Sequence, residues 1–597
     1  MSAETKHRWW VVAALLLGLI ATPPLAQANQ QLEQMSQNAD QWVMPGRTYD
    51  INRYSPLKQI NAGNVKNLQV AWTMSTGALR GHEGQPLVIG NMMYFESAYP
   101  NHVYAINLDD IGRIAWEFTP PADPNAPPVA CCDVVNRGVA YGDGKVIAAA
   151  LDGHIYALDA KTGKVIWDAI NADPLKGQTV TAAPLVVKDK VIIGVSGGEF
   201  GVQGYISAFD LNTGKLAWRA YSTGPDEGML FNPEKTINAN LQKPVGKNSS
   251  LDTWKGDQWK LGGGTTWGWY SYDPKLNLIY YGTGNPGTWN PSQRPGDNRW
   301  SMSIEARNPD TGEAAWVFQM TPHDGWDYDG VNEMVLVELD GKPCLVHFDR
   351  NGYCYVLDRR NGKLLAVHKY DPTVNWAQSI DPHTGRPTVN PAKMTKAGVN
   401  VKGICPAAEG DKDQQPSSFD PVTKLFYVPT NHLCMDYQAF DVKYKAGFPF
   451  VGAILNMTPA SPDVRGRVIA FDPMTGRTKW QIRDKFQDWG GVLTTAGGLV
   501  FQGTLDGWFR AEDIHTGKIL WKFKCPSGII GNPITYTHNG KQYIAVLSGV
   551  GGWAAIGLAA GLTKPSAGLG AVGLTSELGD YTTLGGTLMV FALPSKT

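Results

Sequence analysis

A short repeated pattern constrains the fold of this chain more than any other feature of its sequence. The pattern A-x-D-x-x-T-G-K-x-x-W, or a close variant of it, ends at Trp167, Trp218, Trp316, Trp480 and Trp521. Degenerate copies end at Trp116 and Ala366, and an N-terminal fragment ends at Trp72. Such recurrence is typical of folds built from similar structural units placed side by side.

Each copy of the pattern predicts a β-hairpin. Asp followed by Thr-Gly is typical of a tight turn, because the Asp side chain caps the turn and glycine accepts a positive φ. Alternating apolar and polar residues flank the turn, as they do in strands. The terminal Trp has a fixed offset from the turn, so it can pack one repeat against its neighbour.

The spacing of the copies predicts a propeller. Most repeat ends lie 41 to 51 residues apart, about the length of a four-stranded blade. Two longer intervals, 98 residues before Trp316 and 114 residues before Trp480, must contain insertions. Eight repeat ends therefore predict an all-β, eight-bladed propeller forming one domain over residues 29–597. The apolar run 586–593 would close the ring by pairing with the N-terminal segment.

Composition and charge exclude several classes of protein. The chain has 53 basic and 54 acidic side chains, a net charge of −1. Such a balance gives no strong attraction for nucleic acid or an anionic membrane. Charged residues make up 18% and hydrophobic residues 43%, which excludes a disordered chain.

The N-terminus predicts export. Lys6 and Arg8 precede an apolar run over residues 9–21, and Ala26-Gln27-Ala28 follows. This order is that of a secretory signal peptide over residues 1–28 with its cleavage site. A membrane anchor is the alternative, although the apolar run is short for a spanning helix. The mature chain is expected to begin near Asn29 in an oxidising, extracytoplasmic space.

Seven cysteines are expected to pair in such a space where geometry allows. Cys131 and Cys132 are adjacent in the sequence. Their Cα atoms would be about 3.8 Å apart, below the usual disulfide range of about 4.4–6.8 Å. The dipeptide is either a strained eight-membered disulfide ring or two unrelated thiols.

Four stretches contain residues that the blade repeat does not need. Glu199 follows an apolar strand between glycines, and is either a solvated strand end or a ligand to a cation. Trp267 follows three glycines, so its indole is either open to a flat ligand or part of the core. Asn285 offers an amide oxygen, or serves a turn. Asp327 and Asp329 are two residues apart, so an extended backbone points both carboxylates the same way.

Taken together, these side chains are candidates for a metal site. Glu199, Asn285, Asp327 and Asp329 form an all-oxygen set, which is the ligand type of a hard metal ion. The sequence has no cluster of His and Cys with the spacing of a zinc site.

These motifs resemble a known family. The adjacent cysteines, G-G-E-F-G, T-x-W-G-W-Y, G-N-P-x-T-W-N-P and P-H-D-x-W-D are similar to those of methanol dehydrogenases that depend on pyrroloquinoline quinone (PQQ). The resemblance covers residues 38–594 and is greatest to the lanthanide-dependent, XoxF-type branch. It implies an eight-bladed propeller, PQQ in the central channel and oxidation of methanol and other small primary alcohols. It also implies a periplasmic homodimer that passes electrons to a cytochrome c.

The resemblance further implies roles for individual residues. PQQ would lie between a Cys131–Cys132 disulfide and the Trp267 indole. Its polar groups would be held by Glu83, Arg137, Thr181, Ser196, Gly197, Gly198, Thr265, Arg350, Asn431 and Trp489. The metal ligands would be Glu199, Asn285, Asp327 and Asp329. Asp327 would be the general base, and Arg350 would stabilise negative charge.

Asp329 carries the expectation of a lanthanide such as lanthanum or cerium. The calcium branch of the family usually has alanine at the matching position. An additional carboxylate favours a trivalent ion over a divalent one, because attraction scales with the product of the charges. A turn cap before Gly330 is the alternative role of Asp329.

The remaining expectations concern the other cysteines and the pocket. The resemblance implies a Cys405–Cys434 disulfide. Cys344 and Cys354 flank a hairpin turn and could face each other, which leaves Cys525 free. The pocket walls are expected to include Trp289, Trp326 and Trp553.

Two other functions stay open from the sequence. One is a calcium-dependent PQQ alcohol dehydrogenase with a broader substrate range. The other is a propeller scaffold without catalytic activity, although such a protein would not need the cysteine pair, Trp267 and the metal-ligand set together.

Overall fold

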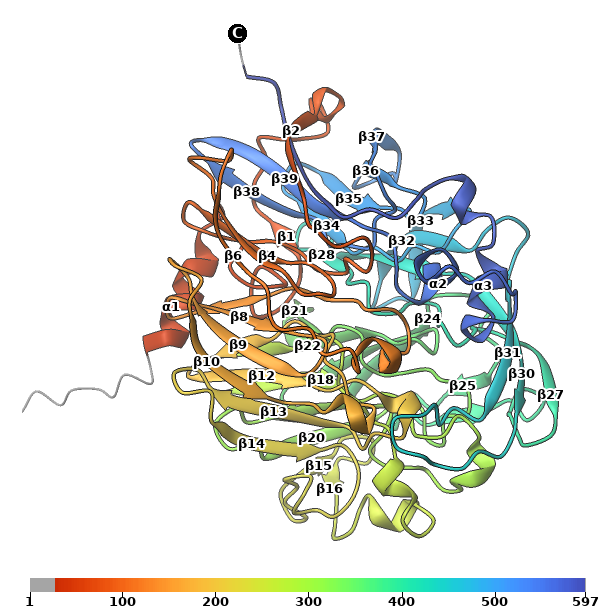
Figure 1. Cartoon of the computed structure of the whole chain (residues 1–597). Helices are drawn as coiled ribbons and strands as arrows, with labels where there is room; N and C mark the ends of the chain where they lie inside the picture. Colours follow the sequence, from red (N-terminus) through yellow and green to blue (C-terminus); the bar gives the residue numbers. More distant parts are fainter. Residues whose placement is uncertain (1–26, 596–597) are drawn as a thin grey trace, which may run out of the picture.

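Short strands and tight turns follow one another along almost the whole chain. The structure, a computed structural model, describes residues 27–595 (Figure 1). Five of its sheets consist of four antiparallel strands that follow one another in space as β3–β6, β7–β10, β11–β14, β21–β24 and β28-β29-β32-β33. The strands of the first three sheets are β3 (Leu87–Ile89), β4 (Met92–Glu96), β5 (Val103–Asn107), β6 (Ile114–Phe118), β7 (Ala140–Gly142), β8 (Lys145–Ala149), β9 (His154–Asp159), β10 (Val165–Ile170), β11 (Leu185–Val187), β12 (Lys190–Gly194), β13 (Tyr205–Asp210) and β14 (Leu216–Tyr221). The strands of the other two are β21 (Val335–Leu339), β22 (Lys342–Phe348), β23 (Tyr353–Asp358), β24 (Leu364–Lys369), β28 (Ser418–Asp420), β29 (Leu425–Asn431), β32 (Gly466–Asp472) and β33 (Arg477–Asp484).

Two further sheets extend the same four-stranded unit. One adds β15 (Ile237–Asn238) and β16 (Lys243–Pro244) to the unit formed by β17 (Ser271–Asp273), β18 (Leu278–Gly282), β19 (Ser303–Arg307) and β20 (Ala314–Gln319). The other adds β1 (Tyr54–Ser55) to the unit formed by β34 (Val492–Thr495), β35 (Leu499–Gly503), β36 (Trp508–Asp513) and β37 (Ile519–Lys524). Four-stranded antiparallel units are therefore the building blocks of this fold.

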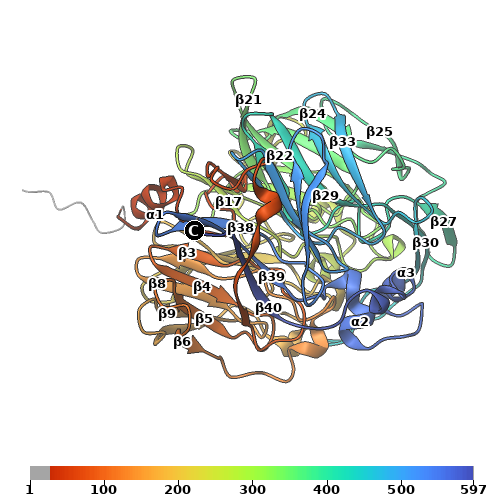
Figure 2. The same cartoon turned by 90° about the horizontal axis from the view of Figure 1, so that it is seen from above.

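The sheet that joins the two ends of the chain was predicted from the C-terminal apolar run. Strand β40 (Thr587–Ala592) lies between β2 (Gln69–Ser75) and β39 (Lys541–Ser548), and β38 (Ile534–His538) completes the sheet. Figure 2 shows β38–β40 next to β3–β5, so the last strands of the chain lie beside the first complete sheet.

The repeat forms the predicted hairpin and the predicted tryptophan contact. In the β9–β10 turn, Asp159 accepts a hydrogen bond of 2.8 Å from the Thr162 backbone N–H, and Gly163 has a φ of 70°. The Trp167 indole donates to the carbonyl of Leu211, the residue after β13, at 2.9 Å. Strand β10 is thus fastened to the next sheet through a residue in its middle.

One degenerate copy uses a different residue for the same contact. No tryptophan ends the copy at Ala366, but His368 lies two residues further along β24, on the same face of the strand. Its Nε2 lies 3.1 Å from the Met474 carbonyl oxygen, and its ring packs against Gly476, the turn glycine of the following repeat. The repeat contact therefore survives without the tryptophan.

The longer predicted insertion forms structure at one end of the molecule. It contains the hairpin β25 (Ala377–Ile380) and β26 (Pro387–Val389), and the sheet of β27 (Asn400–Ile404), β30 (Leu433–Ala439) and β31 (Ala453–Pro459). Helices α2 (Ile556–Ala560) and α3 (Ala571–Leu574) lie beside this sheet (Figure 2).

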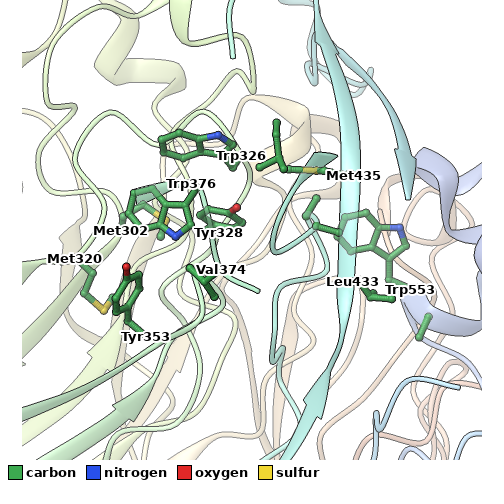
Figure 3. Packing of buried hydrophobic residues seen from close by; sticks show 14 of the residues in the cluster. Met302, Met320, Trp326, Tyr328, Tyr353, Val374, Trp376, Leu433, Met435 and Trp553 are labelled. Carbon is green, nitrogen blue, oxygen red and sulfur yellow. The ribbon is translucent and has the colours of Figure 1, made fainter. Parts of the chain in front are cut away.

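The largest buried hydrophobic cluster joins the insertion to the sheets. Figure 3 shows Trp326, Tyr328 and Trp376 packed together, with Met435 of β30 on one side and Met302 on the other. The Trp326 and Trp376 ring centroids are 4.9 Å apart. This packing fixes the insertion on the end of the molecule that contains the site described below.

The N-terminal helix α1 (Gln27–Gln37) is the first described element. The expected signal peptide over residues 1–28 lies outside the described residues except for its last two positions. Within residues 27–595, no helix is both long enough and apolar enough to cross a membrane.

Candidate active site

A cavity enclosing about 620 Å³ of space brings together residues from many parts of the chain. Its walls include thirteen of the residues predicted from the sequence: Glu83, Cys131, Cys132, Arg137, Thr181, Ser196, Gly197, Glu199, Trp267, Asp327, Asp329, Arg350 and Trp489. Most of them lie in turns and loops rather than within strands.

Two glycines allow the backbone to form the site. Gly197, which ends the loop after β12, has a φ of 117°, and an added Cβ would lie 2.1 Å from the Gly177 carbonyl oxygen. At Gly284 an added Cβ would lie 2.3 Å from the Asp329 carboxylate. Larger residues at these positions would displace the loop that carries Glu199 or the carboxylate of Asp329.

One wall of the cavity contains a buried ion pair between Arg137 and Glu83, beside the Trp267 indole. The Arg137 guanidinium lies 2.7 Å from Glu83 and donates to the Thr181 hydroxyl at 2.8 Å. It also lies over the Trp267 ring, 4.9 Å from the centroid. Burial raises the pKa of Glu83 to about 7 although Arg137 opposes the shift, and the Trp489 indole donates to this carboxylate at 3.2 Å.

A second arginine lies among three carboxylates. The Arg350 guanidinium is 2.8 Å from Asp413, 3.3 Å from Asp327 and 3.6 Å from Asp329. Burial alone would lower the pKa of Arg350, but these carboxylates outweigh it and raise the pKa well above its usual value. Arg350 is therefore a fixed cation with its charge shared by several neighbours.

The carboxyl groups of the predicted metal-ligand set influence one another's pKa. Burial, and then the neighbouring Asp329, raises the pKa of Glu199 to about 7. The same two causes raise the pKa of Asp327 well above its usual value. Asp329 accepts a hydrogen bond of 2.5 Å from the Asn285 backbone N–H. Each carboxylate makes ionisation of the others less favourable, and a bound cation would stabilise their ionised forms.

These ligands are not preassembled. Among the residues that the structure describes, no three His, Cys, Asp or Glu side chains form a group close enough to hold one ion. Their oxygen chemistry fits a hard cation, and small side-chain movements would be needed to enclose it.

Unpartnered polar atoms at the cavity test whether PQQ fits. The Nε atoms of Arg137 and Arg350 and the Oδ1 atom of Asp327 are buried without a hydrogen-bond partner. Such atoms are unusual in a folded protein unless a ligand or water completes them. Two guanidinium groups beside the Trp267 ring suit a flat polyanion, so the residues present fit PQQ.

Four predicted site residues are not part of the cavity wall. Gly198, Thr265 and Asn285 lie directly behind it, since the Thr265 hydroxyl and the Asn285 amide oxygen are 3.4 and 3.6 Å from where a Cβ of Gly198 would be. Asn431 does not line the cavity, and its contact with PQQ stays a prediction. Its amide donates to the carbonyls of Glu409 and Gly410, so it supports a neighbouring loop.

That loop carries the residue that sequence reasoning missed. Asp413 lines the cavity and makes the shortest ion pair to Arg350. Residues 409–415, E-G-D-K-D-Q-Q, have the composition of an exposed loop, yet all seven are buried. No pattern in this single sequence separates such a stretch from a solvent-exposed turn.

The cysteine predictions had mixed outcomes. Cys405 and Cys434 are bonded, and Cys525 is buried and free, as predicted. Cys344 and Cys354 do not face each other, because Cys344 pairs with Asp358 and Cys354 with Phe348 across β22 and β23.

Cys131 and Cys132 both line the cavity, but their sulfurs are not bonded to each other, contrary to the prediction.

The aromatic walls differ from the prediction in part. Trp553 lines the cavity, and the Trp289 ring lies behind it with the two centroids 6.2 Å apart. Trp326 is buried away from the cavity, where its indole donates to the Lys393 carbonyl. Only one of the three predicted tryptophans therefore contacts the cavity directly.

Comparisons with known proteins show which family the chain resembles. The family model for the β-propeller domain of PQQ-dependent glucose, ethanol and alcohol dehydrogenases matches residues 42–372 and 483–544. The lanthanide-dependent methanol dehydrogenase of Methylorubrum extorquens is 58% identical, with 98% of this chain and 99% of the relative covered. Subunit 1 of the cytochrome c-linked methanol dehydrogenase of the same organism is 50% identical, with 98% and 96% covered.

A solved structure extends the similarity to three dimensions. A europium-containing methanol dehydrogenase superposes with a TM-score of 0.92 at 55% sequence identity. The match covers 95% of this chain and 100% of the solved chain.

Proposed function

Because the chain belongs to the family of PQQ-dependent alcohol dehydrogenases with a β-propeller fold, we propose that it is a lanthanide-dependent methanol dehydrogenase. It oxidises methanol and other small primary alcohols to aldehydes and transfers the electrons to a cytochrome c. The observation that carries the proposal is the cavity itself, where two arginines, an indole and three carboxylates of the predicted set line one space.

The residues that would hold PQQ line the cavity around Trp267. Arg137 and Arg350 would bind its acidic groups, and Glu83, Thr181, Ser196 and Trp489 would complete the polar contacts. Bound there, PQQ supplies the hydride acceptor, and the metal ion polarises that acceptor as a Lewis acid.

Asp327 is the proposed general base. Its Oδ1 atom is buried and unpartnered at the cavity, and burial favours a proton on this carboxyl, so it can take the hydroxyl proton of the alcohol. Arg350, 3.3 Å away, holds the carboxylate in place and neutralises its charge. Metal coordination would lower the basicity of Asp327. The oxygen that accepts the proton, Oδ1, would therefore have to be the one that does not bind the metal.

The choice of metal rests on Asp329. With Glu199 and Asp327 it brings the number of carboxylates in the proposed ligand set to three, and Asn285 adds a neutral oxygen. Three negative ligands favour a trivalent lanthanide such as lanthanum or cerium over calcium.

The architecture and location belong to the same proposal. The four-stranded antiparallel units, fastened by the repeat tryptophans, support eight blades in one closed ring over residues 29–597. The apolar segment after Lys6 and Arg8, and a Cys405–Cys434 disulfide, support a periplasmic protein with a cleaved signal peptide over residues 1–28. The proposed assembly is a homodimer.

Reconstitution tests the function. Apoprotein supplied with PQQ and lanthanum should oxidise methanol with an artificial dye as acceptor, and elemental analysis of the native protein should find a lanthanide. An inactive, colourless protein after reconstitution would leave only the scaffold alternative. Equal turnover with calcium and with lanthanum would favour the calcium-dependent alternative.

A further inference from the structure

One aspartate of the P-H-D-x-W-D motif has no role in the proposed function. Asp324 is the third residue of this motif and lies three positions before Asp327, the proposed general base. It does not line the cavity, and only 1% of it is exposed. Burying a carboxylate is costly unless hydrogen bonds or an opposite charge compensate it, so the contacts of Asp324 indicate what it does.

The Asp324 carboxylate holds the backbone on both sides of Asp327. Its Oδ1 atom accepts a hydrogen bond of 3.0 Å from the Trp326 backbone N–H, and its Oδ2 atom accepts one of 3.1 Å from the Tyr328 backbone N–H. Residues 324–329 belong to no helix or strand. Since no regular backbone pattern sets the shape of this segment, the two hydrogen bonds to one side chain fix the backbone around the base.

The backbone of Asp327 has a conformation that needs such support. Its φ is 67°, in the left-handed region that residues other than glycine rarely adopt. This conformation costs free energy and persists only where the surrounding structure enforces it. The two N–H groups that Asp324 binds belong to the residues on either side of this turn. Asp324 therefore opposes the relaxation of Asp327 to a more common conformation.

The side chains that flank Asp327 are anchored outside the cavity. The Trp326 and Tyr328 rings stack with their centroids 5.6 Å apart inside the large apolar cluster (Figure 3). The Trp326 indole also donates to the Lys393 carbonyl at 2.8 Å. Asp327 lies between them in the sequence but lines the cavity, where Arg350 donates to its backbone carbonyl at 3.2 Å and to its carboxylate at 3.3 Å.

A buried arginine fixes Asp324 in turn. The Arg294 guanidinium donates to the Asp324 backbone carbonyl, to the Thr288 carbonyl at 2.6 Å and to the Asn298 side chain at 2.8 Å. All four residues are buried, so water does not compete for these contacts. Asp324 is therefore a fixed point from which the following residues can be held.

We propose that Asp324 is a positioning residue, which holds Asp327 in the orientation that the reaction needs. The proposal rests on the proposed function, in which Asp327 takes the hydroxyl proton of the alcohol. A general base works only within hydrogen-bond reach of the proton that it removes, and a displacement of about 1 Å can lower a rate by about 10²-fold. The rate thus depends on a side chain outside the cavity.

The test measures turnover with and without the base. Asp324→Asn keeps the shape of the side chain but replaces one acceptor oxygen with a donor, so at most one of the two backbone hydrogen bonds can form. In reconstituted holoenzyme, kcat for methanol per PQQ-loaded molecule should fall by about tenfold or more. The same substitution added to Asp327→Asn should cause no further loss, because residues that act as a unit are not additive. A merely structural Asp324 would lower kcat by the same factor in both backgrounds.

A matched control comes from another buried aspartate. The Asp420 carboxylate accepts backbone hydrogen bonds from Val422 at 2.8 Å and Thr423 at 2.7 Å, in a turn outside the cavity. Asp420→Asn removes a comparable support and should leave kcat unchanged. If Asp324→Asn does not fold, Asp324→Ser, a smaller side chain with a single acceptor, takes its place in every comparison.

A crystal structure of the Asp324→Asn protein gives a readout that does not depend on activity. It should show Asp327 with a negative φ or with its carboxylate displaced from Arg350. The proposal is overturned by an unchanged Asp327 in that structure, by an unchanged kcat, or by equal losses with and without the base. A wild-type protein that fails to oxidise methanol would instead refute the proposed function, and the variant structure would still test whether Asp324 positions Asp327.

Discussion

The turns at the blade edges and the loops at the cavity satisfy polar groups in opposite ways. In the β9–β10 turn, Asp159 is half-buried and its carboxylate accepts backbone hydrogen bonds from Lys161 and Thr162. At the cavity, Asp327 is buried with one oxygen unpartnered beside two other carboxylates. The turns complete their own hydrogen bonding, whereas the cavity needs a cation and a ligand to complete it. Stability and chemistry should therefore be separable by mutation.

The largest difference between the effect on activity and the effect on stability is expected at Asp327. Asp327→Asn should lower methanol oxidation by about 10²–10⁴-fold, the usual effect of losing a general base. The melting temperature of the apoprotein should stay the same or rise, because the variant removes a buried, repelled carboxylate. Steady-state kinetics measures the loss of turnover, and calorimetry measures the melting temperature. Normal turnover by a cofactor-loaded variant would place the base elsewhere.

A loss of stability without a loss of activity is expected at a tryptophan of the repeat. Trp167→Ala should lower the free energy of unfolding by about 3–5 kcal/mol, because it opens a cavity between two sheets. Turnover per cofactor-loaded molecule should not change. Trp508→Ala is the matched control, since that half-buried ring contacts the cations of Lys522 and Lys524 and should cost about 1 kcal/mol. Equal losses in the two variants would contradict the docking role of Trp167.

Asp329 tests which part of the site selects the metal. Asp329→Ala should weaken lanthanum binding by about tenfold or more and calcium binding by less, because a trivalent ion loses more with each carboxylate. Titration calorimetry on the apoprotein measures both. Asp329→Asn keeps the shape without the charge and should match the alanine variant. An unchanged preference for lanthanum in both variants would show that Asp329 is not a selector.

The smallest effect concerns the pH dependence of apoprotein stability. Burial raises the pKa of Glu83 from its ordinary 4.5 to about 7, so the folded state holds this proton more tightly than the unfolded state. The resulting stabilisation is complete below pH 4.5 and is lost as the pH rises towards 7. Between pH 5 and 7.5, wild type should therefore lose more stability than Glu83→Gln. If the free energy of unfolding depended on pH in the same way in both proteins, Glu83 would not be the group responsible.

The same contrast explains what the sequence could and could not predict. The hairpins, the tryptophan contacts and the joining of β2 with β40 follow from local turn chemistry and strand patterning. The cavity residues sit in loops with no period, so their roles came from the resemblance to a family. Asp413 was missed because burial of the loop from Glu409 to Gln415 arises only from tertiary packing. His368 shows the reverse case, a repeat contact kept by a different side chain.

The position of β40 between β2 and β39 also constrains when the protein can fold. Three of the four strands in that sheet come from the last part of the chain and one from the beginning. The sheet therefore cannot form until the ribosome has made almost every residue, and a nascent chain keeps an open edge at β2 throughout synthesis.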